Sequence, residues 1–248
     1  MAAAAAKQDV FALSVKHLIK KFPAPPHPDT RPVLEELLYA LCREGATTAQ
    51  ADAAFARLKE DFFDWNEVRV STVPEIGRAL KGLPDGGMKA KRLVEFLQEL
   101  FEADYTFSLE GMEKKGLKQA AKQLARYQGV TDFVVAWVTQ RALGGHAVPL
   151  DEPGLRVLHR LKVISEESED AESLRGSVEH HVSKSEGYAF TEALSEHAAS
   201  ICTENKPDCP KCPLKAECPT GQELLNKKSG KVEKADKAEK PKPKPKAK

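Results

Sequence analysis

The chain has 248 residues, a length that allows one large domain or two small ones. Hydrophobic residues make up 41% of it, enough for a buried core, and aromatic residues 6%. No run of about 18 apolar residues occurs, and the first residues lack the apolar segment of a secretory signal. We therefore expect a cytoplasmic protein with no membrane span. The net charge of +1 is unevenly divided, since residues 227–248 carry ten lysines against three acidic residues, giving +7 there and −6 on the rest. A body this acidic is not an obvious DNA binder.

Apolar residues recur at helical spacing along the whole chain, while strand patterns are scarce, so the sequence predicts an all-α protein. The first helix should end at the proline-rich run PAPPHPDTRP, and Thr47 or Thr48 can cap the third. LPDGG and YQGVTD are typical of turns between later helices. We expect the helices at about 9–21, 32–44, 49–60, 73–81, 88–101, 117–124, from 132 onward, 155–161, 173–183 and 188–201.

The last part of the chain, KVEKADKAEKPKPKPKAK, has the composition of a disordered extended segment. One interpretation is a tail that only keeps the protein in solution. The other is a tether that binds polyanions without reading sequence. Such a tether would bring the protein to nucleic acid and would weaken steeply with salt.

Four of the five cysteines lie within 17 residues, in the pattern C-x6-C-x2-C-x5-C. Clustered thiolates are soft ligands that select zinc or an iron–sulfur cluster, and a reducing compartment disfavours disulfides. Zinc ribbons usually offer two C-x2-C pairs. The single pair here, between loops of six and five residues, favours a [4Fe–4S] cluster, with zinc as the alternative. The expected ligands are Cys202, Cys209, Cys212 and Cys218.

Two other residues are expected to be buried. Cys42 lies on the apolar second helix and should behave as a small hydrophobe. His197 shares a helix face with Phe190, Leu194 and Ile201, which predicts a hydrogen-bonded core histidine near the cysteines rather than a catalyst.

The cysteine run, with Lys206-Pro207 before its second cysteine, resembles the cluster loop of endonuclease III, a helix–hairpin–helix DNA glycosylase. Other segments are similar to this family in the same order: LLYALCREGATTAQADAAFARL, GLPDGGMKAKRL, LARYQGVTDFVVAWV, VPLDEPGLRVLHRL and LSEHAASIC. The resemblance covers roughly residues 10–222. It implies a two-lobed all-α fold with a C-terminal iron–sulfur cluster loop and a disordered Lys-rich tail. The implied parts are a six-helix barrel with the hairpin over 40–155, a cluster domain from 8–39 plus 156–222, and a basic tail over 223–248.

In this family the hairpin binds a DNA phosphate through the backbone amides of a glycine turn and the N-terminus of the next helix. In the matching run YQGVTDFV, Gly129 is kept, but the second glycine is Thr131 and the basic residue is Asp132. A carboxylate there would occupy or repel the place of a phosphate, so a plain helical turn capped by Thr131 or Asp132 stays open. The resemblance implies four DNA-binding residues in this turn: Gln128, Gly129, Val130 and Thr131.

The resemblance also locates the chemistry. In the lyase branch a lysine follows the hairpin and forms a Schiff base with the sugar, but here that position is Phe133, so we expect no lysine-dependent lyase. The family's catalytic aspartate matches Asp151, 18 residues later. A carboxylate there would stabilise positive charge on the sugar of a flipped nucleotide or activate water. Asp151 before Glu152 and Pro153 is equally a good helix N-cap.

Three positions depart from the family pattern. The glutamine that fills the gap left by the extruded base aligns near Gly45, which has no side chain to do so. The histidine two residues beyond the aspartate is Pro153. In the cluster loop, where family members use basic residues to grip DNA, the implied DNA-binding residue Lys206 stands against Glu204 and Asp208.

Three functions are compatible with this sequence. The first is a monomeric, monofunctional DNA N-glycosylase of base-excision repair, which binds double-stranded DNA and hydrolyses N-glycosidic bonds with Asp151. The second is a catalytically degenerate, non-enzymatic DNA-binding or interaction protein on the same scaffold. The third is a small redox or cluster-sensing protein.

Overall fold

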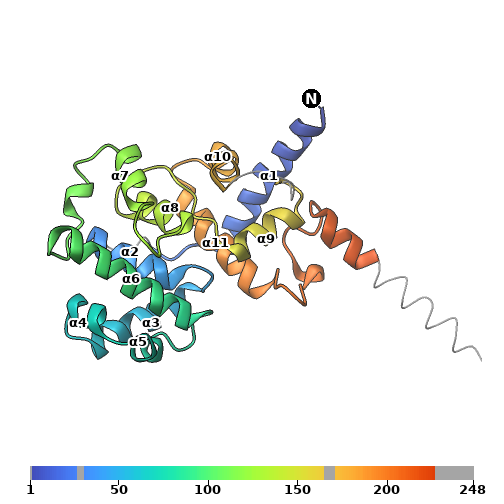
Figure 1. Cartoon of the computed structure of the whole chain (residues 1–248). Coiled ribbons are helices and arrows are strands. Elements are labelled where there is room, and N and C mark those ends of the chain that lie inside the picture. Colours follow the sequence, from blue (N-terminus) through green and yellow to red (C-terminus); the bar gives the residue numbers. More distant parts are fainter. Residues whose placement is uncertain (1, 27–30, 165–170, 227–248) are drawn as a thin grey trace, which may run out of the picture.

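A computed structural model of the chain describes residues 2–26, 31–164 and 171–226 (Figure 1). Of the disordered basic tail predicted at 223–248, residues 223–226 are described and helical, and residues 227–248 lie outside the described ranges. The described parts are helical and contain no strand, as the sequence predicts. The elements are α1 (Ala2–Lys21), α2 (Val33–Arg43), α3 (Thr48–Asp61), α4 (Trp65–Val70), α5 (Val73–Ala79), α6 (Gly86–Asp104), η1 (Glu110–Met112), α7 (Leu117–Leu124), α8 (Asp132–Arg141), α9 (Glu152–Arg160), α10 (Ala171–His181), α11 (Gly187–Ser200) and η2 (Cys209–Lys211).

Every helix predicted from periodicity is present, and the sequence analysis missed α4 and the helical residues 219–226. α4 has only six residues, which is too short for a periodic pattern to emerge. Its start is marked by Asp64, whose side chain accepts a hydrogen bond from the Glu67 amide at 2.8 Å. An aspartate at this position is typical of a helix start, so Asp64 could have indicated α4 in the sequence.

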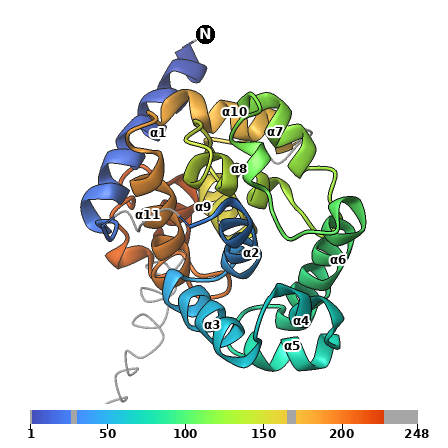
Figure 2. The same cartoon turned by 90° about the vertical axis from the view of Figure 1, so that its left-hand side faces the viewer.

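The helices pack around two hydrophobic cores. The first core surrounds α2, which is apolar almost all the way round and is therefore enclosed by α3, α6 and α8 (Figure 2). Its largest buried side chains include Trp137 and Phe96, and Cys42 is 0% exposed, so the prediction of a buried Cys42 is confirmed. Burial raises the pKa of the Cys42 thiol to about 12.

The second core brings together segments from both ends of the described chain. α1 packs on α10 and α11, and α11 packs on α9, with Phe11, Leu158 and Phe190 buried between them. Figure 1 shows these helices beside the first group, with the cysteine-bearing segment at their outer end. The predicted domain limits stay predictions, although α2 joins the first core from Val33 onward.

A buried ion network connects the two groups of helices. Glu192 on α11 accepts hydrogen bonds from Arg141 on α8 and from the Thr48 hydroxyl, both at 2.7 Å, and lies 3.7 Å from Arg43. All three charged side chains are at most 7% exposed. These contacts fix how α11, and with it α9, sits against the first core. Among the described helices, none is long and apolar enough to cross a membrane.

Candidate active site and cysteine pocket

Asp151 caps the N-terminus of α9, as its place before Glu152 and Pro153 predicts. Its backbone is extended, with φ −98° and ψ 172°, and its Oδ1 accepts a hydrogen bond from the Gly154 amide at 2.9 Å. The residue is only 9% exposed. A cap of this kind stabilises a helix by about 1 kcal/mol. It uses one carboxylate oxygen and leaves the other to a different partner.

That second partner is the backbone of Gly45, 106 residues earlier in the chain. Asp151 Oδ2 accepts a hydrogen bond from the Gly45 amide at 3.0 Å. Gly45 has φ +70°, a conformation that favours glycine and lets the turn after α2 direct its amide at the carboxylate. Both oxygens of Asp151 are therefore held by backbone amides, which sets the orientation of the carboxylate.

A cavity of about 320 Å³ lies against Asp151, between the turn after α2, the start of α6 and the start of α9. Among the described residues, five carboxylates and three basic side chains line it, and no aromatic residue does. A concave site with convergent polar groups is the default place for a ligand. The charged lining residues are Glu44, Asp85, Lys89, Arg92, Asp151, Glu152, Arg156 and Glu204.

Lys89 is the lysine of this cavity, and it is buried, with 3% exposure. Its Nζ donates to the backbone oxygens of Leu41 at 2.9 Å and Glu44 at 2.5 Å, so it satisfies carbonyls at the end of α2. Burial lowers the pKa of the Lys89 ammonium, against the opposing effect of the Glu44 carboxylate. The sequence analysis gave Lys89 no role.

Glu44 connects the cavity to the hairpin. Its Oε2 accepts from Arg92 Nη1 at 2.7 Å, and its Oε1 accepts from the Thr131 hydroxyl at 2.9 Å. Arg92 also donates through Nε to the Gly129 carbonyl at 2.7 Å. One ion pair thus holds α2, α6 and the hairpin turn together, and its side chains are 15–21% exposed, which limits solvent screening.

The hairpin turn requires its single glycine. Gly129 has φ +76°, and a Cβ there would lie 2.8 Å from the Arg92 carbonyl oxygen, so any side chain would force the turn away from α6. The Gln128 amide donates to the Glu99 carboxylate at 2.6 Å. Thr131 caps α8 by accepting from the Val134 amide at 3.4 Å, and Asp132 is exposed in the first turn.

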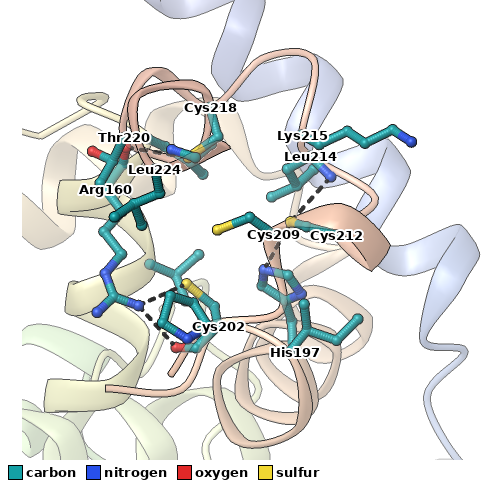
Figure 3. A pocket seen from close by; sticks show the side chains of 15 residues that line it. Arg160, His197, Cys202, Cys209, Cys212, Leu214, Lys215, Cys218, Thr220 and Leu224 are labelled. Carbon is teal, nitrogen blue, oxygen red and sulfur yellow. Dashed lines mark hydrogen bonds between the residues drawn. The ribbon is translucent and has the colours of Figure 1, made fainter. Parts of the chain in front are cut away.

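The four cysteines of the C-x6-C-x2-C-x5-C run line one pocket beyond α9 and α11 (Figure 3). In this view their sulfur atoms face a shared space. No group of three or more His, Cys, Asp or Glu side chains within the described ranges is arranged to hold a metal ion. The four cysteines are Cys202, Cys209, Cys212 and Cys218.

Several donors lie close to these sulfurs. The Leu214 amide donates to Cys212 Sγ at 3.4 Å and the Gly221 amide to Cys218 Sγ at 3.3 Å. Four prolines in this segment have no amide hydrogen, so the amide donors come from other residues of the segment. Burial, together with the charges of the other three cysteines, raises the pKa of the Cys212 thiol to about 11. Four ionised sulfurs here need a positively charged partner.

His197 is a buried neighbour of the pocket, with 1% exposure, as predicted. Its Nε2 lies 3.8 Å from Cys212 Sγ, and its ring packs against Phe22 with centroids 5.7 Å apart. Burial lowers the pKa of His197 to about 4. A histidine that stays neutral and packed in this way is structural rather than catalytic.

No protein-family model matches the chain. A stretch of 120 residues, 45% of this chain, is 28% identical to an adenine DNA glycosylase of Arabidopsis thaliana and spans 19% of that protein's length. Among solved structures, a non-covalent endonuclease III–DNA complex is similar with a TM-score of 0.69 at 18% identity, over 88% of this chain and 98% of that one. The chain has the endonuclease III-like helix–hairpin–helix fold.

Two further structures share this endonuclease III-like fold. A thermostable thymine-DNA glycosylase matches with a TM-score of 0.62 at 21% identity, over 88% of this chain and 97% of that one. An H. pylori 3-methyladenine DNA glycosylase bound to 1,N6-ethenoadenine matches with a TM-score of 0.57 at 17% identity, over 80% of this chain and 99% of that one. The fold predicted from the cysteine run and the collinear segments is thereby confirmed.

Within the endonuclease III-like fold, Phe133 lies away from the cavity. It is 4% exposed, and its ring packs on Trp137 with centroids 5.6 Å apart. The cavity wall contains no part of Phe133. The residue that the sequence aligns with the lyase lysine is thus part of the first core.

The structure brings together some of the predicted site residues and leaves others apart. Asp151 and Gly45 meet at the cavity, and the four cysteines meet at their pocket. Lys206 is exposed in the loop between the first two cysteines, and its contact with DNA stays a prediction. The roles of Lys89 and Arg92 were missed, although a lysine and an arginine on the predicted helix after LPDGG were the available signal.

Proposed function

We propose that this protein is a DNA N-glycosylase of base-excision repair that uses Asp151 and has no lysine-dependent lyase activity. The main support for this proposal is the Asp151 carboxylate, which lies at the wall of a cavity and accepts hydrogen bonds from the Gly154 and Gly45 amides. Solved proteins of the same fold include a thymine-DNA glycosylase and a 3-methyladenine DNA glycosylase. The proposed partner is double-stranded DNA, and a monomer stays our prediction.

The chemistry follows from the placement of this carboxylate. When the N-glycosidic bond breaks, the bonding electrons leave with the base and positive charge develops on the sugar. A carboxylate already oriented by two amides stabilises that charge without having to reorganise. Water then adds to C1′, and its proton passes to a base, for which the Asp151 carboxylate is available. The burial of Asp151 strengthens the charge interaction because water screens it less.

Two features support hydrolysis without strand cleavage. Phe133 has no nucleophilic atom and packs into the core. The lysine that lines the cavity, Lys89, has its Nζ engaged with two backbone carbonyls. A Schiff base with the sugar needs a free amine, so neither residue is set for lyase chemistry.

We propose a [4Fe–4S] cluster in the cysteine pocket, held by Cys202, Cys209, Cys212 and Cys218. The residues present fit this group, because four sulfurs line one pocket, two backbone amides donate to them, and their ionised forms need positive charge. Zinc is the alternative, and the single C-x2-C pair, in place of the two pairs usual in zinc ribbons, favours the cluster. When bound, the cluster would join the cysteine segment to α9 and α11.

A second candidate, a DNA-binding protein without catalysis, is favoured by the hairpin itself. The Glu99 carboxylate already binds the Gln128 amide, and the carboxylate of Asp132 stands in the first turn of α8. Both add negative charge where the resemblance places a phosphate. Weak DNA engagement would leave the cavity without a substrate.

A base-release screen over damaged and mismatched duplexes tests the proposal. The wild type should release at least one base, and Asp151→Asn should abolish release while DNA binding is retained. The matched control is Glu152→Gln, since Glu152 is the exposed neighbour that lines the same cavity. Equal release by wild type and Asp151→Asn would contradict the assigned chemistry. Binding with no release from any duplex would favour the second candidate.

A further inference from the structure

The turn after α2 contacts both Asp151 at the cavity and the hairpin turn. Within two residues it provides the Gly45 amide that binds Asp151 Oδ2 at 3.0 Å and the Glu44 side chain that contacts the hairpin. By the resemblance to the family, Gly45 stands near the position of a glutamine that fills a gap in the DNA, and glycine has no side chain to do this. The structure gives its backbone a different use.

Lys89 holds the backbone of this turn. Its buried ammonium donates to the Leu41 and Glu44 carbonyls, one at each end of the last turn of α2. A positive group at a helix C-terminus also interacts favourably with the helix dipole. Because Gly45 follows Glu44 directly, fixing the Glu44 carbonyl fixes the peptide plane that carries the Gly45 amide.

Glu44 holds the same turn from the side of the hairpin. Its two carboxylate oxygens accept from Arg92 and from the Thr131 hydroxyl, and Arg92 in turn binds the Gly129 carbonyl. The hairpin, α6 and the carboxylate of Asp151 are therefore connected by hydrogen bonds through one dipeptide. Displacing any of these parts moves the amide on which the orientation of Asp151 depends.

We propose that the Glu44–Gly45 turn is a positioning element for Asp151, with Lys89 and Glu44 as positioning residues that hold the Gly45 amide against the carboxylate. This inference rests on the proposed function and adds to it. Asp151 depends on an amide supplied by the other group of helices. The carboxylate is in place only when the hairpin, α6 and α2 are assembled around that turn.

Gly45→Ala is the sharpest variant, because its effect is confined to the backbone. A Cβ at Gly45 would meet only Pro84 Cγ, at 3.9 Å, so there is room for it. The positive φ, however, disfavours any residue with a Cβ, so the turn should relax and move its amide away from Asp151. Gly77→Ala is the matched control, since a Cβ there meets nothing within 4 Å and φ is not positive.

The probes are two duplexes that differ at one abasic site. One carries a neutral tetrahydrofuran ring, and the other carries a pyrrolidine whose protonated nitrogen mimics the charge that develops on the sugar. Affinity for the neutral duplex reports DNA binding, while the ratio of the two affinities reports the carboxylate. The wild type should prefer the cation by about tenfold, and Asp151→Asn should bring the ratio close to one.

Gly45→Ala and Lys89→Met should lower this ratio by about threefold or more with little change in affinity for the neutral duplex. Lys89→Arg, which keeps the donors and the charge, should restore most of it, and Gly77→Ala should keep the wild-type ratio. A thermal melt checks that each variant folds. If Lys89→Met does not fold, Glu44→Gln takes its place, because it weakens the pair with Arg92.

The outcomes separate the two proposals. If Asp151→Asn lowers the ratio while Gly45→Ala and the Lys89 or Glu44 variant leave it unchanged, the inference is overturned and the proposed function stands. If the wild type binds both duplexes equally and Asp151→Asn does the same, the proposed function is overturned and the inference with it.

Discussion

Arg160 places its Nη1 3.4 Å from the sulfur of Cys202 and 2.8 Å from the Thr203 carbonyl oxygen. The same side chain reaches the Glu204 carbonyl through Nη2 at 2.7 Å, so the end of α9 is bound to the segment that carries the first cysteine (Figure 3). A guanidinium beside a sulfur stabilises the thiolate form that a metal requires.

Removing this contact should loosen the cysteine pocket. We expect Arg160→Ala to release iron to a chelator about tenfold faster than the wild type. Residues that hydrogen-bond to metal ligands, without binding the metal themselves, typically contribute 10–100-fold to metal affinity. Arg160→Lys keeps the charge but not the planar fork, so its rate should be intermediate. Iron release is followed by visible absorption. Equal rates for all three proteins would show that Arg160 does not stabilise the site.

The iron content itself is the direct test of the cluster. Purified protein should be brown and contain about four irons per chain. Cys209→Ser should lose most of this iron, since it replaces a sulfur ligand by a hydroxyl, while Cys42→Ser should keep it because Cys42 lies in the other core. Metal analysis of the three proteins decides the question. A zinc content near one per chain with no iron would contradict the cluster.

Thiol alkylation should separate Cys42 from the other four cysteines. Cys42 is 0% exposed and its thiol pKa is raised to about 12, so almost no thiolate is present near pH 8. We expect iodoacetamide to leave it unmodified in the native protein and to label the four pocket cysteines only after chelation. Mass spectrometry counts the labels. Four labels before chelation would mean that the pocket cysteines are not metal ligands.

How much of the site could be predicted from the sequence depended on sequence distance. The cysteine pocket was predictable because its four cysteines lie within one short run, and the capping of α9 by Asp151 is a contact between residues three apart. The bond from Gly45 to Asp151 spans 106 residues, and no local pattern encodes such a pairing. Lys89 was missed for a related reason, since its partners are backbone carbonyls of α2, which leave no mark in the sequence.

The fold shows the same division. Periodicity located the long helices, because an apolar stripe repeats several times along each of them. α4 has too few residues for a stripe and was missed. Periodicity could not place the two helix groups against each other, and only the resemblance implied their arrangement. The contacts between them involve buried charges such as Glu192 and Arg141, which in sequence look like ordinary surface residues.

The absence of lyase chemistry can be tested by trapping. Borohydride should fail to link the protein to DNA that contains an abasic site, because Phe133 is not a nucleophile and Lys89 is held by two carbonyls. A gel shift to a covalent species is the measurement. A trapped species that disappears in Lys89→Met would contradict the prediction and identify the cavity lysine as the nucleophile.

The buried ion network provides the last prediction, which concerns stability. Glu192 is 6% exposed and is the acidic partner of two arginines, Arg43 and Arg141, that are themselves at most 7% exposed. Removing the carboxylate leaves buried positive charge without a partner, which typically costs about 3–5 kcal/mol. We expect Glu192→Ala to lower the free energy of unfolding by roughly this amount, measured as a lower urea midpoint at unchanged slope. Glu196→Gln, one helical turn away and exposed, is the control and should change stability by less than about 0.5 kcal/mol. Equal midpoints for Glu192→Ala and the wild type would mean that the arginines find water or other acceptors when the carboxylate is gone.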